Sequence, residues 1–135
     1  MTSKIVYKGD LRTEMTHLQS GTIVETDAPV DNNGKGERFS PTDLVATALG
    51  SCMLTIMGIA GNTHNINVTG TEVEITKIMT AAPRKIGEII VHLHIKGQDS
   101  YSQKEKAILE NAALTCPVFL SLSEDTKKTV EFSWP

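Results

Sequence analysis

The feature that most constrains this chain is the stretch 44–63, which carries no charged side chain. The run Ser40-Pro41-Thr42-Asp43 stands just before it and has the pattern of a capped helix start. Gly61 and Asn62 are expected to end the helix, which would then span about 41–60 and measure roughly 30 Å. Its apolar side chains surround the axis on every side: Val45, Ala46, Leu49, Met53, Leu54, Ile56, Met57 and Ile59.

A helix that is apolar all round must be covered all round. The chain has 135 residues and a mass of 14.7 kDa, so we expect one domain over 1–135 with little apolar material to spare. We therefore expect a homodimer in which a second copy covers the helix. The stretch is also long enough to cross a bilayer. Small and polar residues such as Thr47, Gly50 and Thr55 dilute it, so we expect burial in protein and no membrane partner.

Composition excludes a further class of partner. The net charge is −3 and no cluster of lysine and arginine is present, which argues against nucleic acid. The N-terminal segment lacks an apolar signal, so we expect a cytoplasmic protein. In that reducing compartment, Cys52 and Cys116 are expected to be catalytic or redox-active rather than a structural disulfide.

The remaining sequence predicts strands and a second helix. Segments 88–96 and 127–134 alternate apolar and polar residues, which is typical of strands with one solvated face. Ser102 and Glu105 form a capping box that opens a helix. Further strands are expected over 71–79, with a less regular phase near Ile78, and in an N-terminal meander over 4–8, 12–18 and 22–26 with a turn at 19–21. A loop over 27–39 leads to the central helix.

The two cysteines are the strongest chemical signal. A buried free thiol is usually an inert core residue, because apolar surroundings raise its pKa. Cys116, however, precedes Pro117, and proline favours the first position of a helix, where unpaired N–H groups and the helix dipole stabilise a thiolate. From this pattern alone, a core role and a reactive role both stay open.

A nucleophilic cysteine needs a cation or a dipole to lower its pKa, and the central helix carries no cation near Cys52. The candidate cations are Arg12, in a strand-like segment, and Arg38, in the loop before the helix. The acids that could hold such an arginine in place are Glu14, Glu37 and Asp43.

The histidines give a weaker signal. His92 and His94 share one face of a predicted strand, at a spacing that can hold a metal ion. No cysteine or acid cluster near them in the sequence completes a site, so we expect no metal there, and His17 and His64 are isolated. The sequence contains no phosphate-binding loop, dinucleotide fingerprint or metalloprotease motif, and we expect no cofactor.

Three segments carry a resemblance to a known family. They are Phe39-Ser-Pro-Thr-Asp-Leu-Val-Ala-Thr-Ala-Leu-Gly-Ser-Cys52-Met, Thr115-Cys116-Pro117-Val118 and Leu11-Arg12-Thr-Glu-Met-Thr-His17. With them the chain resembles the OsmC/Ohr superfamily of osmotically inducible and organic hydroperoxide resistance proteins, and most of all its OsmC-like branch. The resemblance implies an α+β fold, an intertwined homodimer with antiparallel β-sheets wrapped around long central helices and active sites at the interface.

The resemblance also implies thiol peroxidase activity. By position, Cys52 would attack the peroxide and become a sulfenic acid, Cys116 would resolve it as a disulfide, and Arg12 would be the activating cation. An external thiol would then reduce the disulfide, and no metal, haem or flavin would take part. The apolar neighbours of Cys52 on the helix suit an organic hydroperoxide better than hydrogen peroxide: Leu49, Met53 and Ile56.

Thr42 departs from the family pattern. Well-studied members carry a glutamate directly after the proline that opens the central helix, and that glutamate orients the arginine. Here the acid stands one residue later, at Asp43, which turns it about 100° around the helix axis. Either Asp43, Glu14 or Glu37 substitutes, or peroxidase activity is weak or lost. The alternative function is then a non-catalytic protein of the same fold that binds a small apolar ligand or senses redox state.

Overall fold

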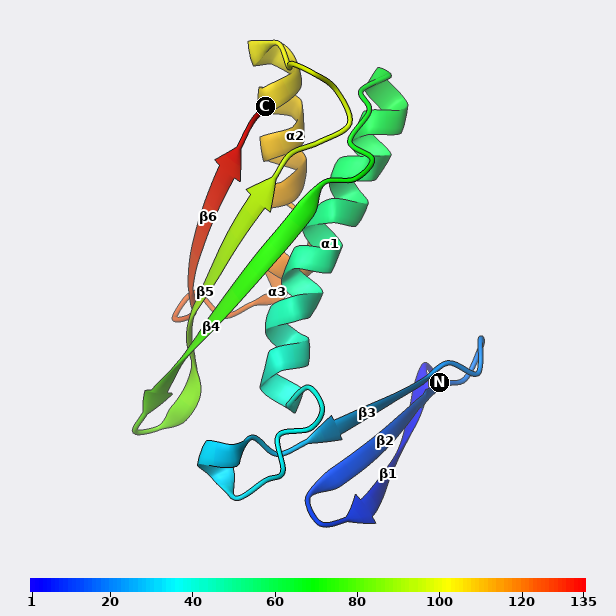
Figure 1. Ribbon diagram of the computed structural model, residues 1–135, viewed down its shortest axis with the longest axis vertical. Coiled ribbons are helices and arrows are strands. Elements are labelled where there is room, and N and C mark those ends of the chain that lie inside the picture. Colours follow the sequence, from blue (N-terminus) through cyan, green and yellow to red (C-terminus); the bar gives the residue numbers. More distant parts are fainter. The chain divides into compact units, whose positions relative to one another are not determined.

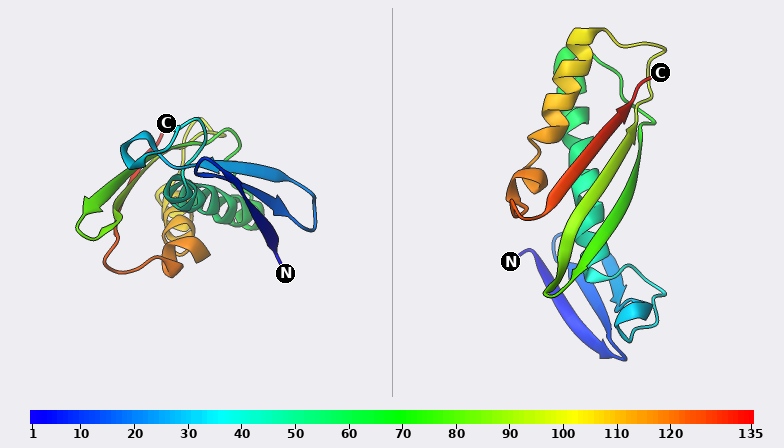
Figure 2. Two further views of the ribbon diagram at one scale, coloured as in Figure 1. Left: turned by 90° about the horizontal axis from the view of Figure 1, so that it is seen from below. Right: turned by 90° about the vertical axis from the view of Figure 1, so that its left-hand side faces the viewer.

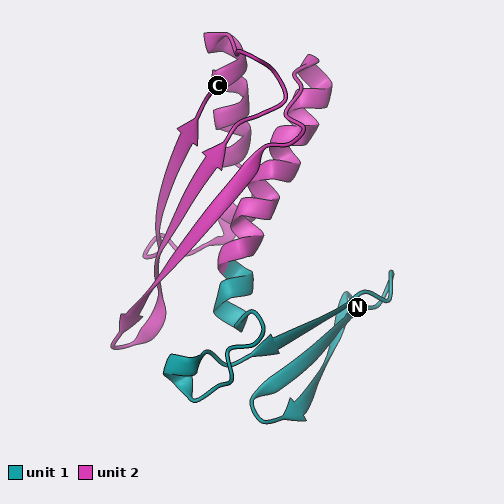
Figure 3. Ribbon diagram, in the orientation of Figure 1, with its two compact units in different colours: residues 1–45 teal, residues 46–135 magenta.

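The computed structural model describes residues 1–135 and divides into two compact units, 1–45 and 46–135 (Figure 3). The first unit is a meander of three antiparallel strands, β1 (Ser3–Gly9), β2 (Arg12–His17) and β3 (Ile23–Asp27), in that order. A short 3-10 helix, η1 (Val30–Asn32), follows. The predicted meander and its turn after His17 are therefore confirmed, whereas the 27–39 segment contains a helical turn that the sequence did not predict.

The sheet of the first unit has one apolar face that is largely exposed. Ile5, Met15 and Val24 lie opposite one another across the three strands, so their side chains share a face. Ile5 and Val24 are 60% and 40% exposed. The buried side chains of this unit are polar: Thr26, Asp27 and Ser40. Since every buried apolar side chain of the chain lies between Ala46 and Cys116, the first sheet has no apolar core of its own.

The central helix α1 spans Pro41–His64. The Ser40 N–H donates to Asp43 Oδ2 at 2.8 Å and the Asp43 N–H donates to Ser40 Oγ at 3.0 Å, which is the predicted capping box. The expected stop at Gly61 and Asn62 is wrong. The helix ends one turn later because Asn65 takes the left-handed conformation and the Ile66 N–H bonds to the Gly61 carbonyl at 2.8 Å, as in a Schellman motif.

The second unit contains a three-stranded sheet in the order β4 (Glu72–Ala81), β5 (Arg84–His94) and β6 (Lys127–Ser133). Strands β4 and β5 are antiparallel, and β5 and β6 are parallel. The parallel pair requires a crossover, which α2 (Gln103–Leu114) and α3 (Pro117–Ser121) supply. The expected α+β class is thus confirmed, but this sheet is mixed rather than wholly antiparallel.

Helices α1 and α2 lie on one face of the β4–β6 sheet and form the core with it (Figures 1 and 2). The predicted inward residues of the segment 88–96 are fully or almost fully buried: Ile89, Val91 and Leu93 of β5, and Ile95 just after it. By length and composition α1 could cross a membrane. Its inward face instead packs in this core through residues such as Leu49, Met53 and Met57. The opposite face of the sheet carries mostly polar side chains, among them Glu74, His92 and Glu131.

Two glycines of α1 provide a matched test of this packing. A Cβ at Gly61 would lie 2.5 Å from the Ile66 carbonyl oxygen, whereas a Cβ at Gly58 would meet nothing within 4 Å. We expect Gly61→Ala to lower the melting temperature, because backbone must shift to admit the methyl group. Gly58→Ala should leave it unchanged or raise it, since alanine favours a helix by about 1 kcal/mol over glycine. Equal effects of the two changes in thermal unfolding would contradict the close approach at Gly61.

Candidate functional site

The two cysteines lie against each other within the second unit. Cys52 is at the start of the fourth turn of α1 and is partly exposed, and Cys116 is the N-cap residue of α3 and is fully buried. Their side chains are close enough to interact directly, and Cys52 contributes to the pKa of Cys116. Residues 64 positions apart in the sequence are thus brought together by the packing of α3 beside α1. Neither forms a disulfide here.

Burial raises the pKa of the Cys116 thiol, and the adjacent Cys52 raises it further. The backbone N–H of Phe119, which donates to Cys116 Sγ at 3.4 Å, acts in the opposite direction but does not offset burial. The expected helix N-terminus at Cys116 is present, but it does not lower the pKa of this thiol, because desolvation outweighs the single N–H contact. The burial of Cys116 therefore disfavours its thiolate.

The neighbours of Cys52 on α1 differ in exposure from those expected for a substrate pocket. Leu49 and Met53 have no exposed surface and belong to the core, so they are not positioned to contact a substrate; Ile56 is partly buried. The exposed apolar residues follow a different stripe. Val45 and Ile59 are seven residues from Cys52 on either side, lie on its face of the helix, and are 42% and 57% exposed. Cys52 therefore lies on an exposed apolar stripe.

Arg12 is held by two carboxylates within the first unit. Its guanidinium donates from Nε to Asp27 Oδ1 at 2.7 Å and from a terminal nitrogen to Asp27 Oδ2 at 2.8 Å, a bidentate pair. The same terminal nitrogen donates to Glu37 Oε2 at 2.9 Å. Asp27 is 1% exposed and also accepts from the Glu37 N–H. The hydrogen bond from Arg12 holds the pKa of Asp27 below its ordinary value, and Asp27 and Glu37 raise that of Arg12.

Asp27 was not among the site residues predicted from the sequence. The residue lies directly opposite Arg12 in the register of β2 and β3, where the meander ends and the 27–39 segment begins. The pairing of Asp27 with Arg12 could have been predicted, because the turn after His17 fixes which residue of β3 faces each residue of β2.

The other proposed acids occupy different places. Glu37 contacts Arg12, while Glu14 lies 3.7 Å from Lys8 and Asp43 caps α1 with Ser40. Arg38 pairs with Glu25 at 3.0 Å. Thr42 approaches Ser40, its Oγ1 lying 3.1 Å from the serine Oγ. Arg12 is thus fixed by a carboxylate from β3, and it belongs to the first unit, whereas both cysteines belong to the second.

The outer face of the second sheet brings His92 and His94 to a third potential ligand. Glu74 on β4 lies opposite His92, and its Oε2 is 3.2 Å from His94 Nε2. One potential ligand atom of each residue lies within 4.8 Å of the others. The reason for expecting no metal there, the lack of a third ligand, is therefore wrong: the acid is close in space although it is distant in sequence.

Comparison with solved structures shows similarity over nearly the whole chain. A protein from Psychrobacter arcticus 273-4, named for an osmotic stress induced and detoxification response, is 48% identical with a TM-score of 0.93, covering 98% of this chain and 96% of that one. An organic hydroperoxide resistance protein OsmC from Legionella pneumophila is 17% identical with a TM-score of 0.76, covering 98% and 97%. One from Elizabethkingia anophelis, with thiocyanate bound, is 17% identical with a TM-score of 0.70, covering 98% and 96%.

The last two similarities concern the fold, since the identities are low. No protein of curated function matches the chain. The sequence model of the OsmC-like proteins matches residues 34–131, a range that includes Cys52 and Cys116 but not Arg12. With the match to the Psychrobacter protein, this shows that the chain belongs to the OsmC-like protein family.

Proposed function

We propose that this protein is a cytoplasmic thiol peroxidase that reduces organic hydroperoxides through Cys52 and Cys116. The observation that carries the proposal is the direct contact of a partly exposed cysteine with a fully buried one. Membership of the OsmC-like family supports a role connected with peroxide or stress. Two free thiols in contact are the arrangement that a peroxidatic and a resolving cysteine require.

The exposure of the two thiols supports the assignment of their roles. A peroxide can reach Cys52 on the exposed stripe, but it cannot reach Cys116. The raised pKa of Cys116 also disfavours it as the first nucleophile, because the thiolate is the reactive form. Cys116 is suited to the second step, in which the electrophile is the neighbouring sulfur.

The chemistry then balances in two steps. The Cys52 thiolate attacks the terminal oxygen of the hydroperoxide, the O–O bond breaks, and the alkoxide takes up a proton to leave as an alcohol. Cys52 becomes a sulfenic acid. The Cys116 sulfur attacks the Cys52 sulfur, its proton leaves with the hydroxide as water, and a disulfide forms. An external dithiol reduces the disulfide and is itself oxidised.

Arg12 is the cation in this proposal. An arginine held by Asp27 and Glu37 keeps its charge and has a fixed orientation, which is what activation of a thiol requires. Asp27 would take over the orienting role of the family glutamate that Thr42 replaces. With Asp27 in this role, Asp43 is not needed to orient Arg12 and is left to cap α1.

A homodimer is part of the proposal. Two apolar surfaces support it: the stripe of α1 that carries Val45, Cys52 and Ile59, and the row of Ile5, Met15 and Val24 on the first sheet. Exposed apolar patches of this kind are usual at subunit interfaces. Cover of the stripe by a second copy would place Cys52 at the interface and give an organic substrate an apolar environment.

The roles of the cysteines can be tested with cumene hydroperoxide, hydrogen peroxide and a dithiol donor. Wild-type protein should consume the organic peroxide faster than hydrogen peroxide, and Cys52→Ser should be inactive. Cys116→Ser should react once and stop as a sulfenic or over-oxidised acid, visible as added oxygen by mass spectrometry. No consumption above the Cys52→Ser control would replace the peroxidase by the small-ligand-binding protein.

The role of Arg12 can be tested by the pH dependence of Cys52 alkylation in a Cys116→Ser background. Arg12→Met should slow alkylation near pH 7 by about tenfold, because the variant lacks the cation that favours the reactive thiolate. Arg38→Met is the matched control, because it removes an arginine of the same unit that pairs with Glu25. An unchanged profile in Arg12→Met, with slower alkylation in Arg38→Met, would transfer the role to Arg38. Thermal unfolding of each variant checks that the fold is kept.

The homodimer can be tested by sedimentation at micromolar concentration. Wild-type protein should sediment as a dimer, and Ile59→Glu should raise the dimer dissociation constant at least tenfold, because the change buries a charge within the stripe. Ala107→Glu, at an exposed position of α2, adds the same charge and should leave the dimer intact. A monomeric wild-type protein would refute the inference from the uncovered apolar faces.

A further inference from the structure

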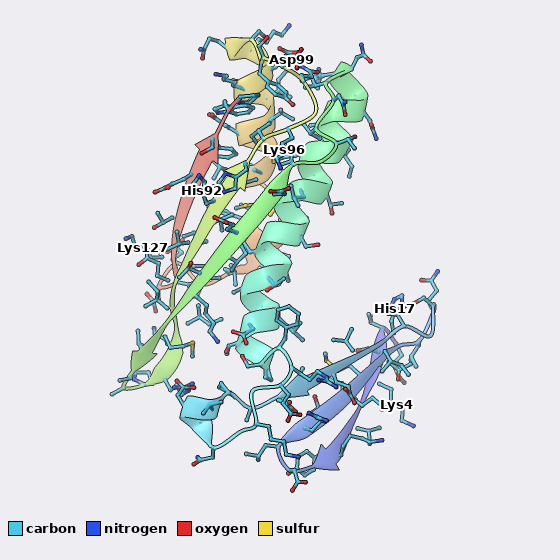
Figure 4. All side chains as sticks on the ribbon, viewed as in Figure 1. Lys4, His17, His92, Lys96, Asp99 and Lys127 are labelled. Atoms are coloured by element: carbon cyan, nitrogen blue, oxygen red, sulfur yellow. The ribbon has the colours of Figure 1, made fainter.

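We propose that Glu74, His92 and His94 form a binding site for a first-row transition-metal ion, with zinc as the expected occupant. The three residues lie on the outer face of the second sheet, where β4 and β5 are neighbours. His92 is labelled in Figure 4. The site shares no residue with the thiol pair or with the Arg12 cluster. An experiment that refutes the metal site would therefore leave the peroxidase proposal untouched, and the reverse also holds.

The backbone register places these three side chains together. Glu74 lies directly opposite His92, and His94 follows two residues later on the same face of β5. The imidazole centroids of His92 and His94 are 4.1 Å apart, and His94 Nε2 lies 3.2 Å from Glu74 Oε2. Ligands bound to zinc at about 2.0–2.1 Å in a tetrahedron are about 3.3 Å from each other. The His94–Glu74 pair already has this separation, and small side-chain rotations bring in His92.

Ser133 provides the outer support that metal-binding histidines usually have. Its Oγ lies 2.7 Å from His92 Nε2, from the neighbouring strand β6. When His92 Nε2–H donates to this hydroxyl, Nδ1 is the nitrogen that keeps a lone pair for a metal. A hydrogen bond on one ring nitrogen fixes the tautomer and the ring orientation in this way. The histidine is thus oriented before a metal binds.

The charges around the histidines favour a cation. Glu74 on β4 and Glu131 on β6 lie opposite His92 on its two sides, and alternation along the strands directs both to the outer face. Glu72, the next acid on this face of β4, is engaged by Lys96 at 2.6 Å. Glu74 contacts His94 instead. The carboxylate nearest the imidazoles is therefore the one that remains available as a ligand.

The set of donors selects the class of ion. Two imidazoles and one carboxylate suit zinc, copper, nickel and cobalt, whereas magnesium and calcium prefer oxygen ligands alone. Three protein ligands leave a fourth tetrahedral position for water or a further ligand. The partly exposed histidines allow a metal to enter from solution.

The site can be tested by titration of the untagged chain with zinc and with cobalt. Because thiolates also bind these ions, the titration uses Cys52→Ser/Cys116→Ser protein beside the wild type. We expect one ion per chain in the double variant, with visible absorption of tetrahedral cobalt. His92→Ala and His94→Ala, made in this background, should each weaken binding at least tenfold. Glu74→Gln should weaken it several-fold, and the matched control Glu72→Gln should not change it.

A second measurement keeps the test valid if the cysteine variant does not fold. In wild-type protein, zinc should shift the ring resonances of His92 and His94 and leave those of His17 and His64 in place. Two results would overturn the proposal. One is the lack of saturable binding at one ion per chain in the double variant, and the other is zinc binding that persists unchanged when both His92 and His94 are replaced by alanine.

Discussion

The structure depends on the covering of one long apolar helix. The inward face of α1 is buried by the β4–β6 sheet and by α2, and this burial forms the whole apolar core of the chain. The outward face keeps Val45 and Ile59 exposed. Since a fully apolar helix gains stability only where it leaves water, the two faces have different consequences: burial of one face stabilises the second unit, whereas the other face stays exposed in the single chain.

The two thiols also differ in how far they are buried. Cys116 is buried, and burial raises the pKa of its thiol, whereas Cys52 is partly exposed on the apolar stripe of α1. The contact therefore joins one buried thiol and one partly exposed thiol. Arg12, the proposed cation, is oriented by Asp27 in a polar part of the first sheet.

Local patterns in the sequence were sufficient to predict most elements of the fold. The capping boxes at Ser40 and Ser102, the alternation in β5 and the N-terminal meander all depend on neighbours within a few residues, and all are present. The predicted end of α1 was wrong because a glycine can allow close packing as well as end a helix. Gly61 lies inside the helix and packs against the Ile66 carbonyl. The parallel pairing of β6 with β5 joins segments far apart in the sequence, so the alternation of apolar and polar residues could not predict it.

The candidate sites show the same limit, since their partners come from register rather than from neighbouring sequence. Strand β4 pairs with β5 in one register near the turn and in another beyond Ile78, because Gly87 is an extra residue in β5. A Cβ at Gly87 would lie 2.6 Å from the Thr80 methyl group, so glycine fits this bulge. Without the shift, Glu74 would face Val91 and point away from the histidines, because a slip of one residue changes the face of every side chain. The irregular phase near Ile78 was the only sequence signal of this bulge, and the bulge is what places Glu74 beside His92 and His94.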